Sequence, residues 1–256
     1  NVFLGIIIGL IAAYSFNKFS EVELPMALSF FSGKRLVPIM TVFFSTILAV
    51  ILLFIWPMVF SGIVAFGEWL VGFGSFGAFL YGVFNRLLIP TGLHHALNAV
   101  FWFDTAGIND IGKFQTGVDA VKGITGRYQA GFFPIMMFGI PAAALAMYHS
   151  AETKQQKQVW GWFLASAISA FVVGVTEPIE FAFMFVAPVL FIIHALLTGL
   201  SLLIASLFHW TAGFSFSAGL IDYVLSLINP IANHPLMLLV QGIVFFILYY
   251  VIFRSM

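Results

Sequence analysis

Long runs without a charged residue are the feature that most constrains this chain. Such runs, each of 17 residues or more, include residues 1–17, 36–67, 128–151, 158–176, 181–221 and 223–253. A helix that spans a bilayer needs about 20 apolar residues. The two longest runs could hold more than one span, or one span plus a re-entrant piece. The spacing does not suit a β-barrel, whose strands alternate over about ten residues. The pattern predicts an all-α polytopic membrane protein with about seven spanning helices and shorter broken segments.

Composition supports this class and excludes others. Charged residues make up 8% of the chain and hydrophobic residues 62%, whereas a soluble domain has about 25% charged residues. Ten basic residues balance ten acidic ones, which leaves no basic surface for nucleic acid. The chain has no Cys, so it offers neither thiolate ligands nor cysteine nucleophiles. It also lacks the HExxH, P-loop and GxGxxG motifs, and we expect no metal and no cofactor.

Polar stretches between the uncharged runs predict the loops. They are Asn17–Arg35, Phe103–Arg127, Glu152–Gln158 and Asn229–Pro235. Basic residues tend to stay cytoplasmic, which favours the cytoplasmic side for Lys18, Lys34, Arg35 and Arg254. The chain opens directly into an apolar run, so we expect a fragment of a longer protein. We expect one membrane domain over residues 1–256.

The first candidate site is the segment Asn85–Asn98, NRLLIPTGLHHALN. Pro90 removes a backbone donor and Gly92 permits unusual dihedral angles, so a helix should break there. A broken helix at membrane depth is tolerated only where it packs inside protein or lines a cavity. The alternative is a turn at the membrane boundary.

Ionisable side chains surround this break. On a helix His94 and Asn98 share a face, and His95 points about 100° away. Intramembrane ionisable residues such as Arg86 usually mark a site or a pathway. The alternative for the histidines is a set of interfacial hydrogen bonds.

The second candidate site is Gly174–Phe181, GVTEPIEF. Pro178 disfavours a helix at Glu177, which should therefore lie at a break or a re-entrant tip. A carboxylate there can accept a proton from a bound hydroxyl. The alternative is a helix N-terminus, with Thr176 as cap and Glu180 in the first turn; both interpretations can hold together.

Two single histidines, His194 and His209, lie in apolar runs. We expect each to make a structural hydrogen bond rather than to act on a substrate.

Four motifs together identify a family resemblance. They are PTGLHHALN, FWFDTAGINDIGKF, GFFPIMMFGIPAAALAMYHSA and GVTEPIEFAFMFVAP. They resemble the IIC membrane component of the bacterial phosphoenolpyruvate-dependent sugar phosphotransferase system, in its glucose superfamily. Within it, FWFDTAGINDIG and YQAGFFPIMMFG are most similar to the N-acetylglucosamine-type branch. The resemblance covers essentially the whole chain.

The resemblance implies an architecture. Family members have N-terminal helices that form much of a homodimer interface, followed by a sugar-binding region with two re-entrant helical hairpins. By this likeness, residues 1–85 would hold the remaining scaffold helices and a connector, with the earliest helices missing. Residues 86–256 would form the sugar-binding region. The location would be the bacterial cytoplasmic membrane.

The resemblance also implies site residues. The family's glutamate and histidine near the sugar 6-hydroxyl match Glu177 and His94, with His95 as a less certain neighbour. Arg86 matches the family arginine, and Thr176 matches the threonine before the glutamate. We expect Glu177 to act as the base, with Arg86 and His94 neutralising negative charge on the transferred group.

Further substrate contacts are expected from residues close to these motifs. Trp102 could stack on a sugar face, and the others could contact hydroxyls or an acetamido group: Asn98, Gln129, Gly131 and Phe132.

The predicted function is sugar uptake coupled to phosphorylation at the 6-hydroxyl. N-acetylglucosamine is the first expectation and glucose the second. The donor would be a phosphocysteine on a IIB domain, fused or separate, with IIA upstream. One alternative is a proton-coupled secondary transporter that uses Glu177 and His94 as a relay. Another is a sensory relative that binds sugar without phosphorylating it.

Overall fold

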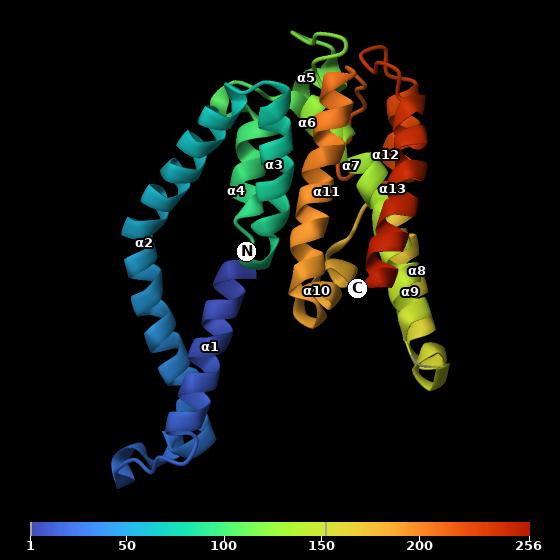
Figure 1. Cartoon of the computed structure of the whole chain (residues 1–256). Helices are drawn as coiled ribbons and strands as arrows, with labels where there is room; N and C mark the ends of the chain where they lie inside the picture. The colour runs from blue at the N-terminus through green and yellow to red at the C-terminus, as the bar shows by residue number, and fades with distance from the viewer. Residues whose placement is uncertain (1, 152) are drawn as a thin grey trace. The chain divides into compact units, whose positions relative to one another are not determined.

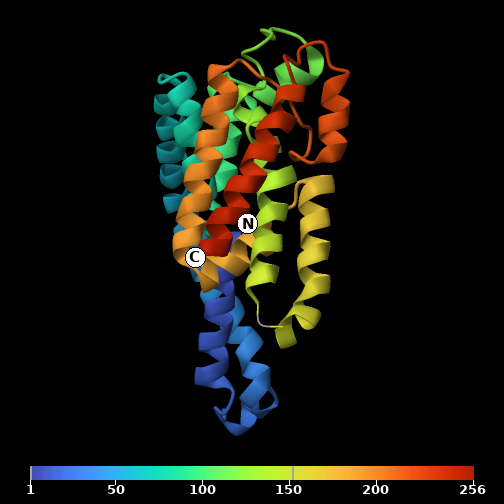
Figure 2. The same ribbon diagram turned by 45° about the vertical axis from the view of Figure 1, so that its right-hand side comes forward.

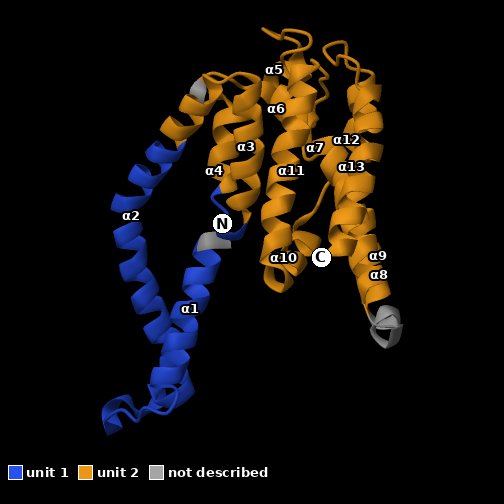
Figure 3. Cartoon of the chain, in the orientation of Figure 1, with its two compact units in different colours: residues 1–63, 90–93 blue, residues 64–89, 94–256 orange. Residues whose placement is uncertain are grey.

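The structure is a computed structural model that describes the backbone of residues 2–151 and 153–256. Side chains are described for residues 4–105, 107–151 and 159–256. Helices of several kinds make up the described part, where the β-type pairing is a single bridge between Thr211 and Asn233. The chain forms two compact units, residues 1–63 with 90–93, and residues 64–89 with 94–256 (Figure 3). The expected division into a scaffold part, residues 1–85, and a sugar-binding part, residues 86–256, stays a prediction.

Unit 1 is a pair of long apolar helices. Helix α1 (Val2–Phe19) is joined by two 3₁₀ turns, Met26–Phe31 and Gly33–Arg35, to α2 (Leu36–Val71), whose last turns belong to unit 2. Phe44 of α2 packs against the ring of Tyr14 of α1, with ring centroids 6.0 Å apart. None of the most apolar window of α2 is buried. A helix that is apolar all round and uncovered requires lipid or protein around it.

Unit 2 contains the remaining helices (Figure 1). They are α3 (Ser75–Leu87), α4 (His94–Phe101), α5 (Asp110–Thr116), α6 (Arg127–Ala130), α7 (Phe132–Pro134), a π-helical turn (Ile135–Gly139), α8 (Ile140–Ser150), α9 (Thr153–Val173), α10 (Glu177–Val186), α11 (Pro188–Leu207), α12 (Leu220–Leu227) and α13 (Leu236–Ser255). Helices α8 and α9 run side by side, and α13 packs against α8 (Figure 2).

Within the part of the chain that the structure describes, four stretches are long and apolar enough to cross a membrane. They are Gly33–Val71, Arg127–Ser150, Pro188–Leu207 and Leu236–Ser255. Two shorter apolar helices cover Leu4–Phe19 and Val159–Val173. The prediction of an all-α polytopic membrane protein is confirmed, and the number of about seven spans stays a prediction.

Glycines allow α3 and α11 to pack closely along their lengths. A Cβ on Gly82 would lie 2.9 Å from the Cα of Gly199, and one on Gly199 would lie 2.6 Å from the carbonyl oxygen of Phe79. Small residues at a crossing let helix backbones approach, which is how membrane helices associate without a hydrophobic driving force. This packing holds the C-terminal end of α3, and with it the first candidate site, in place.

Both predicted helix breaks are present. Helix α3 ends at Leu87, a 3₁₀ turn covers Ile89–Thr91, Gly92 has φ 70°, and α4 begins at His94. The second break separates α9 from α10 at Gly174, whose φ is 83°.

The predicted loops were partly correct. Asn229–Pro235 is irregular, and Phe103–Arg127 is mostly irregular but includes α5. For Glu152–Gln158 the loop prediction is wrong from Thr153 onward, because α9 begins there; Glu152 lies outside the described residues. The apolar run after Gln158 extends the helix back into this polar stretch.

Candidate functional site

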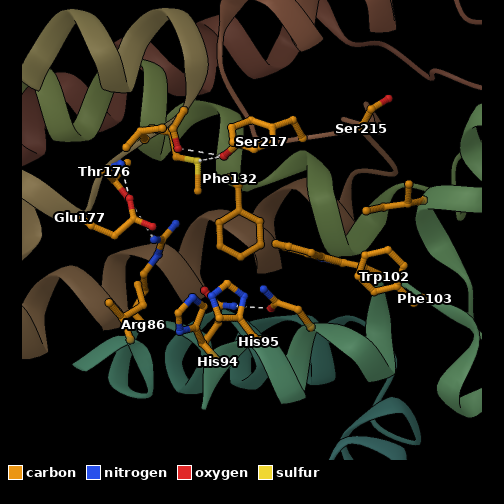
Figure 4. Close-up of a pocket in the computed structure, with 18 residues that line it drawn as sticks. Arg86, His94, His95, Trp102, Phe103, Phe132, Thr176, Glu177, Ser215 and Ser217 are labelled. Atoms are coloured by element: carbon orange, nitrogen blue, oxygen red, sulfur yellow. Dashed lines mark hydrogen bonds between the residues drawn. The ribbon is translucent and has the colours of Figure 1, made fainter. Parts of the chain in front are cut away.

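A cavity of about 460 Å³ lies in unit 2 where the two broken segments meet (Figure 4). Ligand pockets for small molecules have volumes of about 300–1,000 Å³. Eight of the ten predicted site residues line it: Arg86, His94, His95, Asn98, Trp102, Phe132, Thr176 and Glu177. The structure therefore brings together side chains that lie about 90 residues apart in the sequence.

Arg86 reaches the cavity from the last turn of α3 and is 2% exposed. Its Nη1 donates to the Glu180 Oε1 at 2.8 Å, and lies 3.5 Å from the Thr176 hydroxyl. Its Nε and Nη2 have no hydrogen-bond partner among the described residues. The guanidinium carbon lies 5.0 Å from the centre of the Phe132 ring, in cation–π geometry. A buried cation that borders a cavity and has unused donors is suited to attracting an anionic group.

Asn98 presents an amide donor to the cavity from the middle of α4. Its Oδ1 accepts from the Tyr81 hydroxyl at 2.9 Å and from the Asn85 Nδ2 at 2.6 Å. These two bonds fix the orientation of the amide, and its Nδ2 remains available to a ligand.

The two histidines form the floor of the cavity in Figure 4. Their ring centroids lie 4.0 Å apart. His94 is buried and its Nδ1 has no partner among the described residues, whereas His95 is exposed. The geometry favours His94 as the histidine with an unused buried nitrogen, which agrees with the residue that the family resemblance selected.

Glu177 begins α10 and is exposed on the cavity wall. Its Oε2 accepts from the backbone N–H of Thr176 at 3.0 Å, and its other oxygen has no partner in the described part of the chain. Thr176 occupies the N-cap position but makes no side-chain capping bond. The helix N-terminus was therefore predicted correctly, and the capping role of Thr176 was wrong because its hydroxyl faces Arg86.

Aromatic rings form the far side of the cavity. The Trp102 Nε1 donates to the Tyr128 carbonyl at 3.3 Å, which fixes the indole ring. The Trp102 and Phe132 rings meet edge to face, with centroids 6.0 Å apart. Aromatic faces beside polar groups suit the apolar C–H face of a sugar ring.

Two predicted site residues do not line the cavity. Gln129 is fully buried and both ends of its amide are used: Nε2 donates to Asp110 at 3.0 Å and Oε1 accepts from the Phe214 N–H at 2.9 Å. A Cβ on Gly131 would lie 2.6 Å from the backbone nitrogen of Leu202. In this structure Gln129 holds a loop and Gly131 permits close packing against α11, and their contacts with substrate stay a prediction.

Asp110, the partner of Gln129, lies in the surface segment between Phe103 and Arg127. Burial raises the pKa of this carboxyl from its usual 3.8, against the lowering effect of bonds from Gln129 and the Gly126 N–H. The segment is thus held by a buried carboxyl.

Several functional candidates were missed at the sequence level. Ser215 and Ser217 line the cavity from the irregular segment before α12, and no motif marks them. The Ser217 hydroxyl donates to the Gly174 carbonyl at 2.8 Å, so this segment crosses the second helix break. Glu180 was placed in the first turn of α10, but its partners Arg86 and His194 could not be predicted from spacing.

The two single histidines behave as expected. The His194 ring bonds to Glu180 and Tyr249, and the His209 Nδ1 lies 3.1 Å from the Gly123 carbonyl oxygen. Among the described residues, no group of three or more His, Asp or Glu side chains could hold a metal ion.

Comparison with known proteins identifies the family to which this chain is similar. Residues 1–199 match the family described as Phosphotransferase system, EIIC. The chain is 51% identical to the PTS system N-acetylglucosamine-specific EIICB component of Bacillus subtilis strain 168, over 100% of this chain and 57% of the relative. It is 50% identical to the N-acetylglucosamine-specific EIICBA component of Escherichia coli K12, over 98% of this chain and 40% of the relative. It is 46% identical to the N-acetylglucosamine-specific EIIC component of Streptomyces coelicolor, over 98% of this chain and 61% of the relative.

Fold and cavity define a polytopic α-helical membrane protein with a cavity where two broken helices meet. The chain belongs to the phosphotransferase system EIIC family, whose members are multi-pass proteins of the bacterial cytoplasmic membrane. The resemblance to the N-acetylglucosamine-type branch is confirmed. The chain spans about half the length of the curated relatives that it matches.

Proposed function

We propose that this chain binds N-acetylglucosamine and takes part in its uptake with phosphorylation at the 6-hydroxyl. Its relatives carry N-acetylglucosamine-specific names and are described as EIIC, EIICB and EIICBA components. The donor is a phosphocysteine of an EIIB domain, which receives phosphate from EIIA. Because this chain has no Cys, the phosphocysteine must belong to a segment or subunit other than these residues.

One observation carries the proposal. The cavity has a carboxylate with a free oxygen, Glu177, and a buried guanidinium with two free nitrogens, Arg86, on one wall. A hydroxyl that attacks phosphorus needs a proton acceptor, and the transferred phosphoryl group needs positive charge beside it. The two side chains supply these two requirements.

The chemistry balances without a cofactor. The 6-hydroxyl oxygen forms a bond to phosphorus while the phosphorus–sulfur bond of the phosphocysteine breaks. The hydroxyl proton passes to Glu177, and the thiolate leaves with the electron pair. Arg86 and His94 stabilise negative charge on the transferring oxygens, and Thr176 lies beside the guanidinium. Most of the rate enhancement in such reactions comes from positioning and electrostatic stabilisation.

The remaining cavity residues serve sugar recognition. The free amide donor of Asn98 and the exposed ring of His95 bind hydroxyls. Trp102 and Phe132 contact the apolar face of the sugar. Phosphorylation traps the product, since a charged sugar cannot return through an apolar barrier.

The proposed assembly is a homodimer in a lipid bilayer. Unit 1 supports this, because the side chains of Leu53 and Phe54 on α2 are 72% and 75% exposed. Such a helix is stable only against lipid or another helix.

The test is Glu177→Gln, assayed with phosphorylated EIIB and radiolabelled N-acetylglucosamine in vesicles. Loss of a general base lowers rates by about 10²–10⁴-fold, and we expect a fall of that size with sugar binding largely kept. Asp104→Asn is the matched control, because Asp104 is also an exposed carboxylate of unit 2 but does not line the cavity. A Glu177→Gln variant that phosphorylates at the wild-type rate would exclude Glu177 as the base.

The same vesicles distinguish the alternatives. A proton-coupled transporter takes up unmodified sugar in response to a pH gradient without EIIB. A sensory relative binds sugar and neither transports nor phosphorylates it. The family match gives no support to either alternative.

A further inference from the structure

A buried polar cluster lies directly behind the cavity wall. It consists of Glu180 on α10, His194 on α11 and Tyr249 on α13, and it contacts Arg86 on α3. None of the three cluster residues lines the cavity, and each is fully buried. They therefore cannot contact a bound sugar directly.

The cluster begins with an ion pair. The Glu180 Oε1 accepts from the Arg86 Nη1 at 2.8 Å and lies 3.1 Å from the His194 Nε2. A buried ion pair is expensive to desolvate, and apolar residues of the same volume would often be as stable. Its presence behind a site therefore suggests a role beyond stability. The pair fixes Nη1 of the guanidinium and leaves Nε and Nη2 without a partner.

With Glu180 ionised and His194 neutral, the shortest contacts in the cluster assign its hydrogen-bond donors and acceptors. An ionised carboxylate only accepts hydrogen bonds, so the His194 Nε2 must donate to Glu180. In a neutral imidazole the other nitrogen then accepts. The Tyr249 hydroxyl lies 2.8 Å from the His194 Nδ1, so it donates to that nitrogen. Tyr249 thus sets the tautomer of His194, in the way that outer groups orient the ligands of a reactive centre.

The ion pair also fixes one element against another. Glu180 lies in the first turn of α10 together with Glu177, and Arg86 lies on the last turn of α3. The hydroxyl of Thr176, the N-cap residue of α10, lies 3.5 Å from the same guanidinium. The distance between the proposed base and the proposed cation is therefore set through Glu180.

We propose that Glu180, His194 and Tyr249 are positioning residues for phosphoryl transfer. They hold the guanidinium of Arg86 at the cavity wall and hold the first turn of α10 in register with α3. This inference rests on the proposed function, because it assigns Arg86 to the transferred group.

A second polar contact between α11 and α13, the helices that carry His194 and Tyr249, provides a matched control. The Gln241 Nε2 on α13 donates to the Ser201 hydroxyl and carbonyl on α11, both at 2.9 Å. Gln241 is buried, as Tyr249 is, and among the described residues its hydrogen bonds go to Ser201 and not to Arg86, Glu180 or His194. A substitution of Gln241 removes these buried hydrogen bonds and leaves the contacts of Glu180, His194 and Tyr249 in place.

The experiment compares Tyr249→Phe, Glu180→Gln and Gln241→Met in the full protein with phosphorylated EIIB. Initial rates of N-acetylglucosamine phosphorylation are measured per folded protein, with sugar affinity by calorimetry and thermal stability in detergent. We expect Tyr249→Phe to lower kcat about 2–12-fold, the equivalent of one hydrogen bond of about 0.5–1.5 kcal/mol. Glu180→Gln should lower kcat further, and sugar affinity should stay within about twofold. Gln241→Met should lower thermal stability and leave kcat unchanged.

A double-mutant cycle separates positioning from general damage. The Arg86→Lys variant has no planar guanidinium for Glu180, His194 and Tyr249 to orient. Adding Tyr249→Phe to this variant should therefore have no further effect on kcat. Residues that act through one another are non-additive in this way, whereas independent structural effects add.

Several outcomes would overturn the proposal. One is a wild-type kcat in Tyr249→Phe. Another is additivity of Tyr249→Phe with Arg86→Lys. A third is an equal loss of sugar affinity and rate, which would assign the cluster to sugar binding. If Glu180→Gln fails to fold, Tyr249→Phe still decides. A wild-type protein that phosphorylates no sugar would instead refute the proposed function.

Discussion

Two carboxylates on the same turn of α10 lie in opposite surroundings. Glu177 is exposed on the cavity wall and one of its oxygens has no partner among the described residues. Glu180 is fully buried and shares one oxygen between Arg86 and His194. The carboxylate that lacks a cation is available for chemistry, and the one that has a cation is committed to placement.

Arg86 belongs to both regions. One of its terminal nitrogens faces the buried cluster, and its Nε and Nη2 have no hydrogen-bond partner among the described residues. The same side chain can therefore stabilise the fold and bind an anion, because a guanidinium offers five donors in a fixed plane. A Lys at this position could not divide its donors in a fixed geometry.

The largest expected effect comes from replacing the buried carboxylate, Glu180. Glu180→Ala leaves Arg86 buried without its counter-ion, which typically costs about 3–5 kcal/mol. We expect a large fall in thermal stability, measured from the fluorescence of the six Trp residues in detergent. Glu177→Ala, at the exposed carboxylate of the same turn, should be near wild type in stability. Equal stabilities of the two variants would contradict the distinction drawn here.

A double replacement tests whether the buried ion pair is needed for stability or for activity. Removing both members of a buried ion pair and filling the space with apolar side chains is often neutral or stabilising. Arg86→Met with Glu180→Leu should therefore recover much of the stability that Glu180→Ala loses, and it should phosphorylate no sugar.

A smaller effect on stability is expected at Gly131, which packs closely against Leu202 of α11. Gly131→Ala would place a Cβ 2.6 Å from the Leu202 backbone nitrogen. Overpacking of this kind costs about 1–3 kcal/mol, so thermal stability should fall. Gly161→Ala is the control, because a Cβ there meets nothing within 4 Å. If Gly131→Ala instead lowers sugar affinity at unchanged stability, the residue contacts the sugar after all.

The sequence predicted most of the fold class and one side of the site. Uncharged runs report helices directly, because the bilayer demands internally satisfied backbone. The breaks at Pro90 and Gly174–Pro178 follow from local backbone chemistry. The boundary at Thr153 was missed because a helix can extend beyond the membrane core into polar residues.

The remainder of the site depends on contacts distant in sequence. The partners of Glu180 lie 94 residues before it and 14 residues after it, and no periodicity reports such pairs. Ser215 and Ser217 lie in an irregular segment whose path is set by tertiary contacts. Gln129 was near the correct motif, but which way its amide points depends on Asp110 and Phe214. Spacing predicts which face a residue occupies, and only packing decides its partner.

The smallest effect concerns Asn98, which lies where wall and buried polar groups meet. Asn98→Ala removes one donor from the cavity, so sugar affinity should fall by about 2–12-fold, as expected for a hydrogen bond of about 0.5–1.5 kcal/mol. Tyr81→Phe is the matched control, since the Tyr81 hydroxyl donates to the Asn98 Oδ1 at 2.9 Å and does not line the cavity. It should lower stability slightly and leave affinity nearly unchanged, because the Asn85 bond at 2.6 Å still orients the amide. Calorimetric titration with N-acetylglucosamine measures both. If Tyr81→Phe weakens binding as much as Asn98→Ala does, the Tyr81 hydroxyl is required to orient the Asn98 amide. Tyr81 would then contribute to sugar binding although it does not line the cavity.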